Sequence, residues 1–147
     1  MRAFIFVLTL VLVPAVAGAQ TFVSKVSPHD VATTMDRLQA AVEGAGATVF
    51  ARIDHAAGAA NVGQDLAPNQ LLIFGNPKLG TPMMQSAPTM GLDLPLKVQV
   101  YRGEDGKTRV FYRKMDAVAA DHGASSPALM KAAGALDKLT GKAIAAE

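Results

Sequence analysis

A run of four apolar residues, Leu71 to Phe74, followed at once by glycine and proline, is the feature that most constrains how this chain folds. Four consecutive apolar residues predict a short buried strand. The sequence Gly75-Asn76-Pro77 predicts the end of that strand, because glycine and proline interrupt regular structure. Thr81 before Pro82 predicts the N-cap and first position of a new helix. We therefore expect a buried strand, a tight loop over residues 75–81 and a helix.

Helices and strands alternate in the first half of the chain, and a hairpin is predicted in the second half. Ser27 and Pro28 predict the start of an amphipathic helix, which precedes a strand over residues 48–53. Two alternating runs, residues 97–101 and 108–113, flank an Asp-Gly turn and predict the hairpin. We expect an α+β fold. It is a single two-layer domain with a mixed sheet of about five strands, helices packed on that sheet and a late β-hairpin.

The first nineteen residues have the three regions of a secretory signal peptide. Arg2 supplies the positive charge, residues 3–13 are apolar apart from one threonine, and Ala17-Gly18-Ala19 provides a cleavage site. The apolar stretch is too short to span a bilayer comfortably. We expect cleavage before Gln20, a single domain over residues 20–147, a periplasmic or secreted location and no stable membrane anchor after cleavage.

The composition narrows the classes of function. The net charge is +2, and removal of Arg2 with the leader lowers it by one to +1, which gives no basis for nucleic-acid binding. The chain has no Cys, which excludes disulfides and a thiol nucleophile. None of its serines lies in a G-x-S-x-G motif. We therefore expect a binding protein rather than an enzyme.

Several segments occur in the order that is typical of one family. They are residues 34–49, 53–57, 62–63, 66–69, 71–81 and 91–97. The sequence resembles the domain-of-unknown-function 302 (DUF302) family over roughly residues 24–140, most specifically in the string FGNPKLGTP at residues 74–82. The resemblance implies a compact α+β fold and suggests a homodimer. It does not imply an activity.

Two groups of residues are candidate ligand contacts. In the loop after the buried strand, glycines allow close approach of the backbone, and a helix N-terminus with Lys78 favours an anion. Asp54 and His55 follow another strand, at a strand end where functional residues are common. We expect the two strand ends to face a common hollow that binds a small anionic or planar molecule. The candidate ligand-binding residues are Asp54, His55, Gly75, Asn76, Lys78, Gly80 and Thr81.

Two alternative functions remain open. His55 with Met83 or Met84 would suit haem or copper, because imidazole and thioether groups ligate these cofactors. That pattern predicts a haem- or metal-binding redox protein. Against it, methionine is more often a core filler, and adjacent residues on a helix point about 100° apart. In the second alternative the protein is a purely structural homodimer, in which residues 75–81 only form a turn.

Overall fold

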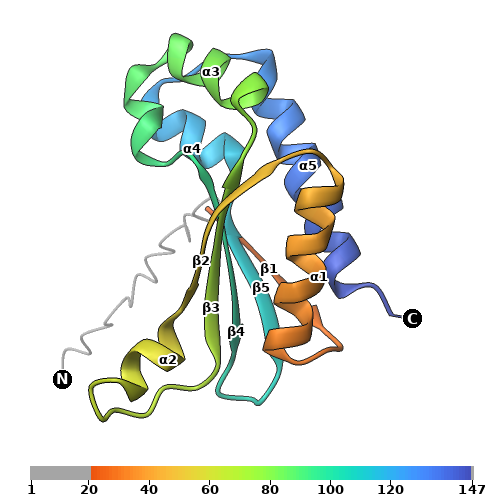
Figure 1. Ribbon diagram of the computed structural model, residues 1–147. Coiled ribbons are helices and arrows are strands. Elements are labelled where there is room, and N and C mark those ends of the chain that lie inside the picture. The colour runs from red at the N-terminus through yellow and green to blue at the C-terminus, as the bar shows by residue number, and fades with distance from the viewer. Residues whose placement is uncertain (1–20, 147) are drawn as a thin grey trace, which may run out of the picture.

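Five antiparallel strands form the centre of the computed structural model, which describes residues 21–146 (Figure 1). The strands are β1 (Phe22–Ser27), β2 (Thr48–Asp54), β3 (Asn69–Gly75), β4 (Leu96–Arg102) and β5 (Thr108–Arg113). The helices are α1 (Val31–Gly44), α2 (His55–Ala60), α3 (Pro77–Ser86), α4 (Met115–His122) and α5 (Pro127–Ile144), with a short 3-10 helix η1 (Pro88–Leu92). The expected signal peptide and its cleavage before Gln20 lie outside the described residues.

The strand order in the sheet is β1-β5-β4-β3-β2, and every neighbouring pair is antiparallel. The predicted α+β class, the five strands and the late hairpin of β4 and β5 are confirmed. The sheet, expected to be mixed, has no parallel pair among these strands. The reason is that α1 carries the chain from β1 at one edge to β2 at the opposite edge, so these two strands of like direction are not neighbours.

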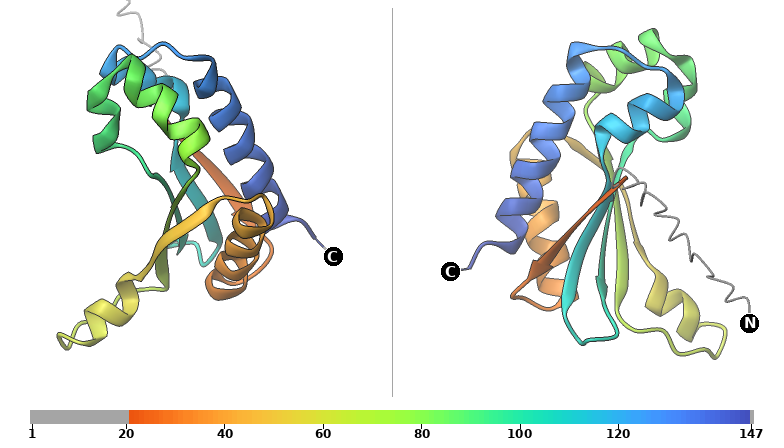
Figure 2. Two further views of the ribbon diagram at one scale, coloured as in Figure 1. Left: turned by 45° about the horizontal axis from the view of Figure 1, so that its top comes forward. Right: turned by 180° about the vertical axis from the view of Figure 1, so that it is seen from behind.

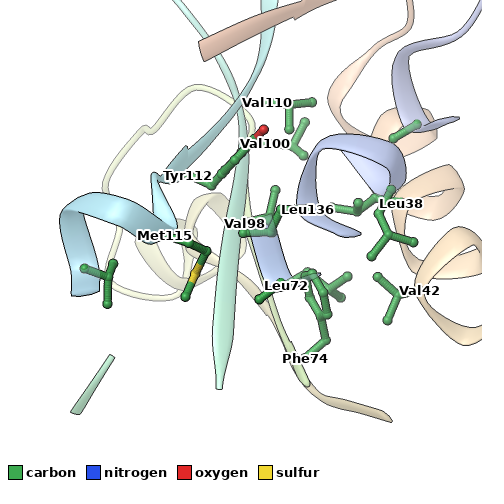
Figure 3. Close-up of a cluster of buried hydrophobic side chains, with 14 of the residues drawn as sticks. Leu38, Val42, Leu72, Phe74, Val98, Val100, Val110, Tyr112, Met115 and Leu136 are labelled. Atoms are coloured by element: carbon green, nitrogen blue, oxygen red, sulfur yellow. The ribbon is translucent and has the colours of Figure 1, made fainter. Parts of the chain in front are cut away.

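One face of the sheet is covered by a layer of two helices, α1 and α5 (Figures 1 and 2). Alternate strand residues point into this interface, as expected for a pleated strand, and they are buried: Leu72, Phe74, Val98, Val100, Val110 and Tyr112. Leu38 and Val42 of α1 and Leu136 of α5 face them from the helical layer (Figure 3). The hydrophobic core therefore lies between this helical layer and one side of the sheet.

Helix α1 begins later than the sequence predicted. Asp30, not Ser27, is its N-cap, because the Asp30 carboxylate accepts a hydrogen bond from the amide of Thr33 at 2.7 Å. The Ser27 hydroxyl is buried and forms a hydrogen bond with the Thr34 hydroxyl at 2.7 Å, which ties the end of β1 to the helix. Pro28 consequently lies in the connection and not in the first turn.

Candidate functional site

The expected loop over residues 75–81 is largely helical. Asn76 is the N-cap of α3, since its side-chain oxygen accepts a hydrogen bond from the Lys78 amide at 2.9 Å, and Pro77 occupies the first turn. The prediction of Thr81 as N-cap is wrong: Thr81 lies inside α3, and so does Pro82. Because Pro82 has no N–H, α3 lacks the hydrogen bond that residue 82 would donate to the Lys78 carbonyl.

Asp54 and His55 lie at the opposite end of the sheet from Gly75. The antiparallel register places Asp54 beside Gln70 and Thr48 beside Gly75. Gln70 and Gly75 are five residues apart along β3, which corresponds to about 17 Å in an extended strand. The expectation that the two strand ends face a common hollow is therefore wrong. Both oxygens of Asp54 have structural partners, the Ala57 amide at 3.0 Å and the Gln70 side chain at 3.2 Å.

The same separation rules out a shared cofactor site of His55 with Met83 or Met84. His55 is an exposed residue that begins α2. Met83 and Met84 lie in α3, beyond the other end of β3, with Met83 in the core and Met84 exposed. A haem or copper centre that joins them is therefore contradicted by the geometry. Within residues 21–146, no three His, Cys, Asp or Glu side chains are grouped as a metal site.

A largely apolar cavity of about 240 Å³ lies between the start of α3 and the segment that enters β4. Four of the predicted ligand-binding residues line it, Gly75, Asn76, Gly80 and Thr81. The two predicted metal-ligand methionines, Met83 and Met84, line it as well. Pro77 and Leu79 of α3 also line it, and the remaining lining residues come from distant parts of the chain: Phe50, Leu94, Pro95, Leu96 and Ala132. Lys78, Asp54 and His55 are not among the lining residues. Asn76 and Thr81 are therefore the only polar side chains in the lining.

The glycines keep the cavity open at two places. A Cβ on Gly75 would lie 3.5 Å from Cβ of Pro95 and 3.6 Å from the Phe50 ring, and a Cβ on Gly80 would lie 3.9 Å from a methyl of Leu94. These are ordinary van der Waals contacts, so a small side chain is tolerated at either position but occupies space in the cavity. Phe50, which is 56% exposed, lines the cavity from the edge strand β2.

A polar cluster that the sequence did not predict holds the segment at the Leu94 side of the cavity. The Asp93 carboxylate accepts one hydrogen bond from Arg113 at 2.9 Å and lies 2.7 Å from Nε2 of His122, whose Nδ1 is 3.0 Å from the Thr89 hydroxyl. The hydrogen bond to His122, followed by the Arg113 guanidinium, holds the pKa of Asp93 below its usual value. Arg113 also pairs with Asp121, and the two carboxylates raise its pKa. The cluster fixes Asp93, and with it the adjacent Leu94, to β5 and α4.

Comparison with known families gives a match over most of the chain. Residues 23–146 match the family described as "Domain of unknown function DUF302". A solved structure of the same fold is the crystal structure of an uncharacterized conserved DUF302 protein from Bacillus stearothermophilus. Its TM-score is 0.70 at 20% identity, and the alignment covers 86% of this chain and 97% of that one. At this identity the likeness supports the fold alone.

Curated relatives match over a shorter region. The proteins named "Fluoride-specific ion channel FluC 1" from Brucella suis and from Brucella abortus are each 46% identical to this chain over 85 residues. The matched region is 58% of this chain but only 33% and 31% of those proteins, so the chain corresponds to about a third of their length. Across residues 21–146, no helix has the length and apolar character needed to cross a membrane.

Proposed function

This chain belongs to the DUF302 family, and we propose that it binds a small, planar, apolar molecule in the cavity beside Gly75 and Gly80. The observation that carries the proposal is the lining: eleven of its thirteen residues have apolar side chains or are glycine, and the other two are Asn76 and Thr81. Binding pockets for small molecules are typically apolar with a few convergent polar groups. No catalytic role is assigned to any of these residues.

The size of the cavity supports an occupant of one or two rings. An apolar cavity of roughly 150 Å³ is known to hold benzene, so about 240 Å³ suits a somewhat larger planar molecule. For a ligand of about ten heavy atoms, a binding free energy near −5.5 kcal/mol corresponds to a dissociation constant of roughly 0.1 mM. The Asn76 amide is already hydrogen-bonded to the Lys78 amide and the Gly46 carbonyl, so the Thr81 hydroxyl is the lining group that would orient a polar substituent of such a ring.

The lining favours an apolar occupant over an anion. Lys78, the cation next to the N-terminus of α3, is exposed and is not part of the cavity. The side chain of Asn76 already accepts a hydrogen bond from the Lys78 amide, which leaves one fewer donor for an anion at this N-terminus. An anion in the cavity would also lose its hydration among apolar side chains without a charged partner.

Isothermal titration with a graded set of compounds tests the proposal. We expect benzene, indole and naphthalene to bind, and phosphate and haem to give no specific heat. Gly80→Leu should abolish binding because the leucine side chain fills the cavity, whereas Gly134→Leu, in a helix position open to solvent, should not. Lys78→Ala should leave binding unchanged. Equal affinity of the wild-type and Gly80→Leu proteins, with both folded in thermal melts, would refute the proposal.

The names of the Brucella relatives add one compound to the test. They are called fluoride-specific ion channels, and this chain covers about a third of their length. Fluoride is a strongly hydrated anion, and the cavity lining offers no cation and only two polar side chains to replace its water. We therefore include fluoride in the titrations and expect no binding. A saturable fluoride signal that Lys78→Ala abolishes would instead favour an anion site at the start of α3.

We also propose that the domain works outside the cytoplasm. The support is the leader-like pattern of residues 1–19, with its cleavage site after Ala19. Intact-mass analysis of the protein recovered from the periplasm of an expressing bacterium should give a chain that begins at Gln20. Recovery of the uncleaved chain from the cytoplasmic fraction alone would contradict this location.

A further inference from the structure

The face of the sheet opposite α1 and α5 has no helical layer over it within residues 21–146. We define this outer face by the residues that the strand register places on it. Its apolar members are Phe22, Val26, Ala51, Ile53, Leu71, Ile73, Gly75, Tyr101 and Phe111, and its polar members are Ser24, Thr48, Asn69, Lys97, Gln99, Arg109 and Arg113. We propose that this face, together with residues 55–68, is the interface at which two copies of the chain form a dimer.

The middle of the outer face is uncharged across all five strands. The register aligns Ser24, Phe111, Gln99, Leu71 and Ile53 in one row. Aromatic rings also lie in the neighbouring rows. The ring of Phe111 stacks on that of Phe22 with 4.9 Å between ring centroids, and it meets the ring of Tyr101 edge-on with 6.3 Å between centroids. An uncharged, aromatic centre with polar residues around it is the composition of a protein–protein interface.

The charges of the outer face lie in the rows on either side of this centre, and each already has a partner within the chain. Arg109 pairs with both oxygens of Asp105 at 2.6 and 2.8 Å, and Arg113 pairs with Asp93 at 2.9 Å. The Lys97 ammonium donates to the carbonyls of Asp93 and Pro95. Carboxylates compensate both arginines, whereas the partners of Lys97 are uncharged carbonyls. With only Lys97 uncompensated, the face has little attraction for a polyanion and weak repulsion toward an identical face.

Residues 55–68, which we call the arm, supply the second part of the interface. In each view the arm extends from the sheet on the side away from α1 and α5 (Figures 1 and 2). Its helix α2 has no buried residue, and Val62 and Leu66 in the following loop are exposed apolar side chains. Among residues 21–146 of one copy these side chains stay largely exposed, whereas a second copy packed on the outer face lies beside them.

The area required for a stable dimer supports a second copy held by both parts. Five strands at about 4.8 Å spacing, with side chains over about 20 Å of each strand, make a face of roughly 500 Å². A stable interface takes about 800 Å² from each partner, so the face alone falls about 300 Å² short and the dimer requires the arm to bury that remaining area. A two-fold axis through the face sets each arm against the other copy, which is the self-complementary arrangement that such dimers use.

Sedimentation analysis of the full chain tests this dimer. We expect the wild-type protein to be dimeric at about 0.1 mM, and we expect Ile53→Lys and Leu66→Lys each to raise the dimer dissociation constant at least about tenfold. These side chains are 39% and 47% exposed, so both variants should fold normally in thermal melts. Met130→Lys is the matched control, because Met130 is 81% exposed on α5, in the helical layer on the other side of the sheet. A monomeric wild type, or equal loss of the dimer in the Met130 variant, would overturn the proposal.

The absence of cysteine from the sequence allows a second measurement. Gln99 is in the middle row of the middle strand, so a two-fold axis through the face brings the two copies of this residue close together. Gln99→Cys should form a disulfide-linked dimer under mild oxidation, and Met130→Cys should not. Cross-linking of the two variants at equal rates would contradict the interface. None of these positions lines the cavity, so the result is independent of ligand binding.

Discussion

Replacement of Gly80 by alanine should make the protein more stable and the cavity a weaker binding site. Gly80 is inside α3, where glycine is less favourable than alanine by about 0.8 kcal/mol. The new methyl group meets a methyl of Leu94 at 3.9 Å, an ordinary contact, so no strain offsets this gain. At about 2.1 cal/mol/K of unfolding entropy per residue for the described chain, the gain raises Tm by roughly 3 °C.

The same methyl group enters the space that the ligand would occupy. Fitting a two-ring molecule into a cavity reduced by one methyl group should weaken its binding by about 1 to 2 kcal/mol. This change raises the dissociation constant of naphthalene roughly five- to thirtyfold, whereas benzene, which leaves part of the cavity empty, should lose less. Differential scanning calorimetry measures the first effect, and isothermal titration with the two compounds measures the second.

Gly134→Ala is the control for this experiment. Gly134 is inside α5, a Cβ at this position meets no atom within 4 Å, and the residue does not line the cavity. We therefore expect a similar gain in Tm and unchanged binding of both compounds. The conclusion that Gly80 forms part of the ligand cavity is wrong if Gly80→Ala binds naphthalene as tightly as the wild type does. It is also wrong if Gly80→Ala lowers Tm while Gly134→Ala raises it.

Four further predictions follow from individual contacts. Asn76→Ala removes the N-cap of α3 and should lower the free energy of unfolding by about 1 kcal/mol in urea titrations, whereas no loss would exclude the capping role. Leu72→Ala empties a fully buried position and should lower the free energy of unfolding by about 3 kcal/mol. If this variant loses less stability than the outer-face variant Ile73→Ala, the position of the core is wrong. Because the pKa of folded Asp93 lies below 3.8, its ion pairs stabilise the fold fully above that pH and less as the pH falls through the folded-state pKa. Thermal melts of Asp93→Asn should therefore show lower stability near neutral pH and a weaker acid dependence below about pH 4, and an unchanged acid dependence would count against the cluster. Asp54→Ala should leave global stability within about 0.5 kcal/mol, because α2 buries no residue, but should speed hydrogen exchange at the Ala57 amide; slow exchange there would disprove the cap.

The sequence predicted those elements whose signals are local. The hairpin of β4 and β5 was expected from alternating residues around an Asp-Gly turn, and its inward-facing valines are buried. The start of α3 was misplaced because Asn76-Pro77 and Thr81-Pro82 are both good cap-and-proline pairs. Local rules do not rank these two pairs, whereas the packing of the partly buried Leu79 against the core favours the earlier start.

The candidate site depends on contacts that local patterns do not contain. Asp54 and Gly75 were expected together as two strand ends, but antiparallel neighbours bring the end of one strand beside the start of the next. The walls of the cavity come from Phe50, Leu94 and Ala132, which are far apart in the sequence and meet only in the folded chain. The glycines at positions 75 and 80 were the local signal that pointed to part of the cavity lining.

Mapping of a bound planar compound by two-dimensional NMR tests the central claim most directly. Naphthalene added to the labelled protein should shift the amide signals of Gly75, Gly80 and Thr81 and the methyl signals of Leu94 and Ala132, which line the cavity. The signals of His55 should stay unchanged, because that residue lies beyond the opposite end of β3. Shifts centred on His55 and Asp54, or no shifts at a saturating concentration, would contradict the account.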